Sequence, residues 1–225
     1  MFFRTALLVM RKDFTIEAKS REILYTTLLF ALSCVLVFSI AFVKEGEPLE
    51  DAAAGILWIA VAFAGTLALG RTFERERSGE TLRALLLAPA PRAAIYVGKM
   101  LGILLLLAVV ELMLVPLVAV LFHAPLFAEP LLLAALLASG TLGFSAVGAL
   151  FAAMLVRART RDVMLPILLY PMTVPVMIAG VRGTSAVLQS PADTASAIMW
   201  IGLLASFDVV FVTLALWTFE PVMTE

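Results

Sequence analysis

Long apolar stretches separated by short polar segments make up most of this chain. Six of them are long enough for a bilayer core about 30 Å thick, which needs roughly 20 helical residues: 23–43, 52–70, 100–122, 131–156, 163–181 and 198–219. Because backbone polar groups in lipid must be paired within their own segment, each stretch is predicted to be a helix. The pattern predicts an all-α membrane protein in which residues 1–225 form a single transmembrane domain.

The segment before the first span, residues 1–22, has a helical period of its own. Its apolar residues recur at i, i+4, i+7 and i+11, which places them on one helical face: Phe3, Leu7, Met10 and Phe14. Basic residues on the other side would face lipid headgroups. We expect either an amphipathic helix lying in the membrane interface or a simple basic flank that sets the topology.

Composition agrees with lipid as the main solvent. Hydrophobic residues make up 63% and charged residues 15% of the 225 residues, whereas soluble domains have roughly 45–50% and about 25%. The net charge of −1 says little about partners because the charges are segregated along the chain. No nucleic-acid partner is expected. The single cysteine, Cys34, excludes an internal disulfide framework and any metal site built from several cysteines.

The basic residues also predict the orientation of the spans. Fourteen of the 16 Lys and Arg residues precede the first span or lie between spans two and three or spans four and five. Positive residues accumulate on the cytoplasmic side of a membrane. Both termini are therefore expected in the cytoplasm, and residues 44–51 and 182–195 outside.

The long basic segment 71–99 contains the most informative pattern. Its first residues alternate in charge, and Ser78 can cap a helix in which leucines recur at i, i+3 and i+4: Leu82, Leu85 and Leu86. Pro89 and Pro91 would end that helix. The apolar side of this short amphipathic helix would either dock into a groove on another protein or lie on lipid.

The same segment resembles the coupling segment of ABC-2-type exporter permeases, on the following residues: Glu74, Arg75, Glu76, Gly79, Leu82, Leu85, Leu86 and Pro89. Within that group the chain resembles the haem exporter protein B (CcmB) family. The resemblance extends along the whole chain and includes Lys12-Asp13, Gly55 through Trp58, Gly98-Lys99, Gly140 through Gly143, Leu165-Pro166, and Pro171 through Gly180.

This resemblance implies a six-span permease subunit of the bacterial inner membrane that works with a separate ATPase. It also implies haem-handling membrane subunits and a periplasmic haem chaperone as partners, and haem as a possible cargo. A subunit of this size is expected to pair as a homodimer. No G-x-x-x-x-G-K-[ST] motif occurs in the chain, so ATP would act through the partner, and we expect no enzymatic activity and no directly bound cofactor.

The resemblance is compatible with two ways in which ATP hydrolysis by the partner would be used. Haem would cross the membrane through this subunit, or the subunit would remodel a haem–chaperone complex without transporting anything. A deep polar cavity reaching both leaflets would favour transport, and a dry interface between two copies would favour remodelling. An ABC-2 exporter of a lipid, a polysaccharide or a drug is the alternative with the same fold.

Two carboxylates fall inside predicted spans, Glu111 in the third and Asp208 in the sixth. A charged residue at a helix centre costs about 2.5–3.5 kcal/mol on insertion scales, so such residues usually face a bundle interior or water. We expect a conduit or interface role for them, or a structural hydrogen bond.

Small residues and prolines mark two further spans. Small residues in the fourth span recur every four positions, which indicates either packing within the chain or a seam between two copies: Thr141, Ser145, Ala149 and Ala153. In the fifth span Pro166, Pro171 and Pro175 are candidate kink positions, because proline removes a helical hydrogen bond. They predict a helix that is bent for packing or one that is broken and moves.

Overall fold

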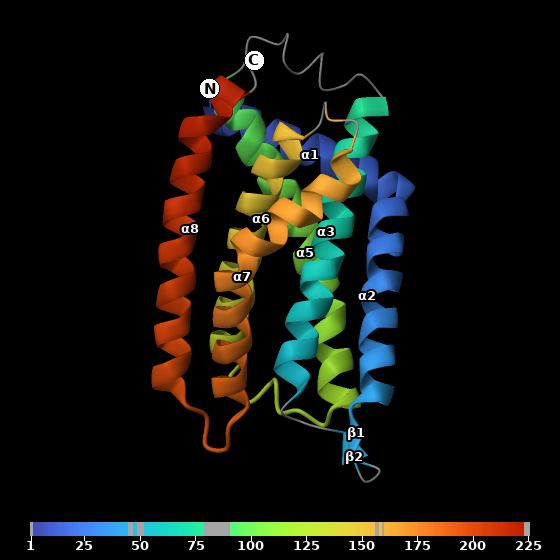
Figure 1. The fold of residues 1–225 in the computed structure, drawn as a ribbon, viewed down its shortest axis with the longest axis vertical. Helices are drawn as coiled ribbons and strands as arrows, with labels where there is room; N and C mark the ends of the chain where they lie inside the picture. The colour runs from blue at the N-terminus through green and yellow to red at the C-terminus, as the bar shows by residue number, and fades with distance from the viewer. Residues whose placement is uncertain are drawn as a thin grey trace.

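A computed structural model of the chain describes residues 2–44, 47–48, 52–78, 91–155, 158 and 160–222. In chain order the elements are α1 (Phe2–Ser20), α2 (Glu22–Ala41), β1 (Val43–Lys44), β2 (Glu47–Pro48), α3 (Ala53–Ser78), α5 (Arg92–Leu121), α6 (Pro130–Met154), α7 (Arg161–Leu188) and α8 (Thr194–Val222). Six of these helices, all except α1, are long and apolar enough to cross a membrane, and they run alongside one another (Figure 1). Each overlaps one predicted stretch, so the predicted six-span, all-α fold is confirmed apart from the short β1–β2 hairpin.

The first helix lies across the bundle rather than along it. Figure 1 shows α1 at the end where α8 terminates, which we call the α1 end; the end that carries β1 and β2 is the hairpin end. Ala6 and Val9 are buried, while Phe3 and Leu7 are 84% and 57% exposed. The apolar face predicted from the sequence therefore points away from the protein, as expected for a helix whose outer side contacts lipid.

Two helices extend further into the segment 71–99 than the hydrophobic pattern predicted. Helix α3 continues eight residues past the predicted span, through Ser78, and α5 begins at Arg92, eight residues before its predicted span. Glu and Arg are good helix formers, so a helix can run out of the apolar layer without a break. Hydropathy marks where a span leaves lipid, and it does not mark where the helix stops.

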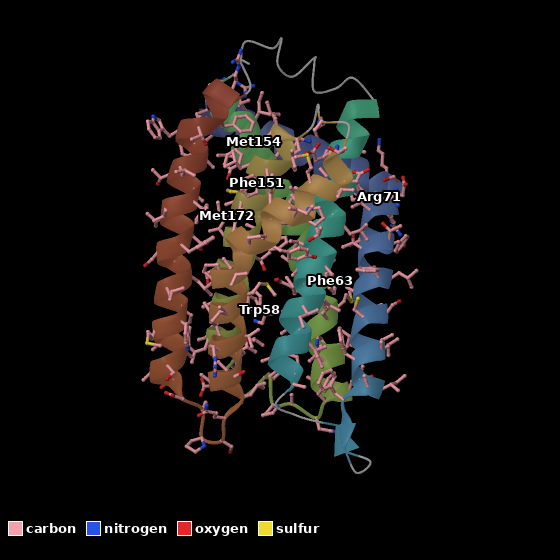
Figure 2. All side chains as sticks on the ribbon, viewed as in Figure 1. Trp58, Phe63, Arg71, Phe151, Met154 and Met172 are labelled. Carbon is pink, nitrogen blue, oxygen red and sulfur yellow. The ribbon has the colours of Figure 1, made fainter. Side chains whose placement is uncertain are left out.

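Glycines let three helices close around one tryptophan. Trp58 of α3 is 1% exposed, and its indole N–H donates a hydrogen bond of 2.9 Å to the hydroxyl of Thr184 on α7. A side chain at Gly140 of α6 or Gly180 of α7 would collide with the Trp58 ring. Figure 2 shows Trp58 between α3 and α7, near the middle of the bundle. This contact joins α3, α6 and α7 at mid-bundle.

Helix α6 forms the centre of the bundle and contacts α3, α5, α7 and α8. Its evenly spaced small residues are all at least 96% buried by the chain's own helices: Thr141, Ser145, Ala149 and Ala153. A second copy could not reach them without opening the subunit. The reading of this stripe as a seam between two copies is therefore wrong, and the reading as packing within the chain is confirmed.

The proline-bearing helix α7 is bent and stays helical. All three prolines lie inside it, and it remains continuous from Arg161 to Leu188. Figure 1 shows the part of α7 nearest its start inclined across α3, and Figure 2 places Met172 close to the bend. Of the two readings of the prolines, the structure supports a bend and not a break.

Candidate coupling site

The predicted ATPase-coupling residues fall into two groups. Glu74, Arg75 and Glu76 belong to the last two turns of α3, in a part of the helix whose side chains the structure does not describe. The others lie outside the described residues: Gly79, Leu82, Leu85, Leu86 and Pro89. The structure therefore describes how the segment 79–90 is held at its two ends, by the arms formed by α3 and α5.

A buried arginine holds the α3 arm. Arg161 is the first residue of α7, and it is only 3% exposed. Its guanidinium donates a hydrogen bond to the backbone carbonyl of Gly70 on α3, while its Nε lies 3.9 Å from the exposed carboxylate of Asp162. A guanidinium keeps its charge when buried, and hydrogen bonds from charged groups are stronger than neutral ones. The arginine ties α3 to the start of α7 where α3 leaves the apolar layer.

A buried lysine holds the α5 arm. Lys99 of α5 is 4% exposed, and its amine lies 2.6 Å from a carboxylate oxygen of Asp13 on α1. The other oxygen of Asp13 lies 3.0 Å from the amine of Lys12. Next to Lys99, Gly98 lets α1 approach closely: a Cβ atom there would lie 2.6 Å from the Ala6 carbonyl oxygen. The ion pair and the glycine together fix α1 against α5.

These two contacts lie at matching positions on the arms. Gly70 is eight residues before the end of α3, and Lys99 is seven residues after the start of α5. At 1.5 Å per residue, each contact is about two and a half helical turns, or roughly 13 Å, from the segment 79–90. A movement of that segment would pull on both contacts, one leading to α7 and the other to α1.

The two intramembrane carboxylates do not meet. Glu111 of α5 accepts a hydrogen bond from the hydroxyl of Thr141 on α6, as the structural reading of this residue predicted. Asp208 of α8 packs against Gly143 of α6, and within the described part of the chain its Oδ1 has no hydrogen-bond partner. Residues 141 and 143 face nearly opposite sides of a helix. Among the described residues, the two carboxylates thus lie on different sides of α6 and do not contact each other.

A cavity of about 550 Å³ lies beside the α3 arm, between α2, α3 and α7. Phe30, Phe63 and Tyr170 form its aromatic wall, with ring centroids 6.2 and 6.3 Å apart for the two successive pairs. Arg71 and Asp162 line its mouth, and Figure 2 shows Phe63 and Arg71 on the face between α7 and α2. On α3 the cavity is lined by residues from Phe63 to Arg71, and Trp58 lies closely packed on the hairpin side of Phe63. The cavity therefore occupies the half of the bundle at the α1 end.

Sequence reasoning did not single out the anchoring residues as a site. Asp13 belongs only to the family resemblance, Lys99 belongs to that resemblance and to the basic residues that predict the topology, and Arg161 belongs only to those basic residues. A usable signal existed for Lys99, which follows a glycine and directly precedes a long apolar stretch. Nothing local to Asp13 or Gly70 indicates a partner, because both partners come from distant parts of the chain.

The chain matches known proteins along nearly its whole length. A family model described as CcmB protein matches residues 4–223. The chain belongs to the CcmB family. Heme exporter protein B of Escherichia coli strain K12 is 38% identical over 201 residues, which cover 88% of this chain and 89% of that protein. The protein of the same name from Shigella flexneri is 40% identical over 179 residues, 79% of each chain. That of Pseudomonas aeruginosa is 26% identical over 211 residues, 94% of this chain and 93% of the relative.

Membership in this family gives the structural contacts a context. The family resemblance covers both sides of the ion pair, Lys12-Asp13 and Gly98-Lys99, and also Trp58 with the glycines that enclose it. The pattern of motifs along the sequence thus corresponds to contacts in space. The chain is a multi-pass membrane permease subunit.

Proposed function

We propose that this chain is the membrane subunit of a haem-export ABC transporter that serves cytochrome c maturation. It couples ATP hydrolysis in a separate ATPase subunit to movement in the bacterial inner membrane. The curated relatives are named heme exporter proteins, and the match extends over most of both chains. ATP acts through the partner, and haem is the cargo of the pathway.

One observation supports the mechanical part of this proposal most directly. The buried cation Arg161 ties α3, on one side of the segment 79–90, to α7. The buried cation Lys99 ties α5, on the other side of the segment, to α1. A push on the segment would therefore be passed to α7 through Gly70 and to α1 through Asp13. A bent helix such as α7 is suited to respond, because its prolines have already removed part of the hydrogen bonding that stiffens it.

The orientation follows from the basic residues. The α1 end faces the cytoplasm, where the ATPase is, and the hairpin end faces outward. In a Cys34→Ala background, cysteine at Lys19 should react with a membrane-impermeant reagent only after the cells are opened. Cysteine at Ala128, between α5 and α6, should react in intact cells. The reverse labelling would reject this orientation and with it the placement of the ATPase.

Of the two outcomes of coupling, the cavity favours remodelling of a haem–chaperone complex. The aromatic cavity at the α1 end does not pass the level of Trp58, which α6 and α7 enclose. Haem crossing through one copy would require these helices to separate. Remodelling needs only movement at the outer surface, transmitted by a packed bundle. In this proposal the partners are haem-handling membrane subunits and a periplasmic haem chaperone, and the chain is paired as a homodimer.

The decisive experiment concerns the segment between the arms. Leu85→Asp would place an unpaired charge in the contact if Leu82, Leu85 and Leu86 fill a groove on the ATPase, and burying such a charge is costly. The variant should insert normally but lose the ATPase subunit on purification, and cytochrome c maturation should fail. Arg83→Ala is the matched control on the same segment and should be mild. If Leu85→Asp keeps the partner and full activity at normal membrane levels, the segment rests on lipid and the transmission route fails.

A further inference from the structure

A second cavity, separate from the aromatic one, lies in the corner between α1, α2 and α5. Its volume is about 330 Å³, and Thr72 of α3 also lines it. Its lining divides by chemistry. The part near α1 is charged, and the part further along α5 is apolar: Ile103, Leu105, Leu106 and Val109. We propose that this cavity binds one phospholipid with an anionic headgroup from the leaflet at the α1 end.

The length of the cavity along α5 matches the depth of one leaflet. From Lys99 to Val109 the cavity follows α5 for ten residues, which is about 15 Å at 1.5 Å per residue. That is roughly half of the 30 Å hydrocarbon core, or one leaflet. A headgroup at the charged end would therefore place its acyl chains along Leu105 and Val109.

The charges at the headgroup end favour an anion. The cations there are Lys12, Arg21 and Lys99, against the carboxylates of Asp13 and Glu17. Asp13 is already balanced by two amines, at 2.6 and 3.0 Å. One oxygen of Glu17 accepts a hydrogen bond of 2.8 Å from the backbone N–H of Leu24. Three cations against two carboxylates leave a net positive charge at this end of the cavity. Arg21 is the exposed cation among the three, and its guanidinium lies 3.3 Å from the Tyr25 hydroxyl.

The surroundings explain why a lipid is the occupant. Helix α1 exposes Phe14 and Ile16, which also line the cavity, so this wall lies in the lipid interface itself. A water-soluble anion would leave the apolar half uncovered. A transmembrane helix of a partner would cover the apolar half but bring no anion to Arg21.

The test uses the purified full-length chain in detergent and native mass spectrometry, with phosphatidylglycerol, phosphatidylcholine and inorganic phosphate as probes. Wild-type protein should retain one phosphatidylglycerol in preference to phosphatidylcholine, and inorganic phosphate should not compete. Arg21→Gln should weaken phosphatidylglycerol binding about fivefold, the effect of one basic residue near an anionic lipid surface. Lys19→Gln removes the same charge two residues away, outside the cavity, and is the matched control with little effect.

A second variant examines the acyl-chain half without changing charge. Leu105→Trp adds bulk to the partly exposed apolar wall, and it should reduce retention of the bound lipid while the protein still elutes as a folded species. Equal binding of the two lipids, or equal loss in Arg21→Gln and Lys19→Gln, would overturn the proposal. So would unchanged retention in Leu105→Trp, or cross-linking of a cysteine at Leu105 to a partner protein in membranes with no lipid retained. None of these measurements depends on the ATPase, so their failure leaves the coupling function untouched.

Discussion

The two arms that flank the segment 79–90 are anchored by different chemistry. On the α3 arm a guanidinium on α7 binds a backbone carbonyl, that of Gly70. On the α5 arm the amine of Lys99 binds the carboxylate of Asp13 on the peripheral helix α1. The carbonyl cannot be removed by substitution, whereas both partners of the ion pair can. The first contact leads into the bundle and the second to its surface, so breaking them should damage different properties.

The largest expected effect is on stability, at the α5 arm. Asp13→Asn leaves the 4%-exposed Lys99 without its carboxylate, which should lower the free energy of unfolding by about 3–5 kcal/mol. Denaturation in detergent micelles, followed by circular dichroism, would measure this loss. Lys99→Met should cost much less, because Asp13 keeps Lys12 at 3.0 Å. Equal losses in the two variants would mean that the ion pair does not hold this arm.

A smaller loss of stability, with a larger loss of coupling, is expected at the α3 arm. Arg161→Met removes the hydrogen bond to Gly70, and bonds involving charged groups contribute about 1.5–3 kcal/mol. The variant should still bind the ATPase, but cytochrome c maturation should drop while ATP hydrolysis by the complex continues. Arg161→Lys keeps the charge and should recover part of maturation. Full maturation in Arg161→Met would show that α7 does not receive motion through this contact.

Adding one methyl group at the α1–α5 contact should have an intermediate effect. In Gly98→Ala the new Cβ would lie 2.6 Å from the Ala6 carbonyl oxygen and 2.7 Å from Val9 Cβ, and overpacking of this kind costs about 1–3 kcal/mol. Gly102→Ala is the control one turn away, since its nearest neighbour is 3.8 Å distant. The difference in thermal midpoint between the two variants measures how tightly α1 is held. Identical midpoints would mean that α1 is loosely docked.

The smallest effect is expected at Asp193, which lies before α8 at the hairpin end, far from both arms. Hydrogen bonds from Ser196 hold the pKa of the Asp193 carboxyl below its ordinary value of 3.8, with the Ser196 N–H at 3.0 Å from Oδ1. Because the folded-state pKa is lowered, the stabilisation is present above that ordinary value and is lost as pH falls through the folded-state pKa. The thermal midpoint of wild type should therefore fall slightly more on acidification than that of Asp193→Asn, which keeps a capping oxygen. Coupling should not change.

The sequence alone was enough for the six spans, because a bilayer imposes a length and an apolar composition that can be read without a structure. It also supported the family assignment, which the family model and the curated relatives confirm. The sequence alone did not predict the residues at which the helices end. Charged residues 71–78 leave the apolar layer but remain in α3, because helix propensity and hydropathy are separate properties.

Only the tertiary structure decided which polar residues are anchors. Asp13 and Lys99 are 86 residues apart in the chain, and Arg161 and Gly70 are 91 apart. No local pattern links residues at such separations, since helix periodicity relates positions only three or four apart. The small-residue stripe of α6 shows the same limit: its spacing predicts close packing, but whether the neighbour is this chain or a second copy depends on how the other helices surround it. Local chemistry determined which segments enter the membrane, and long-range packing determined which charges hold them together.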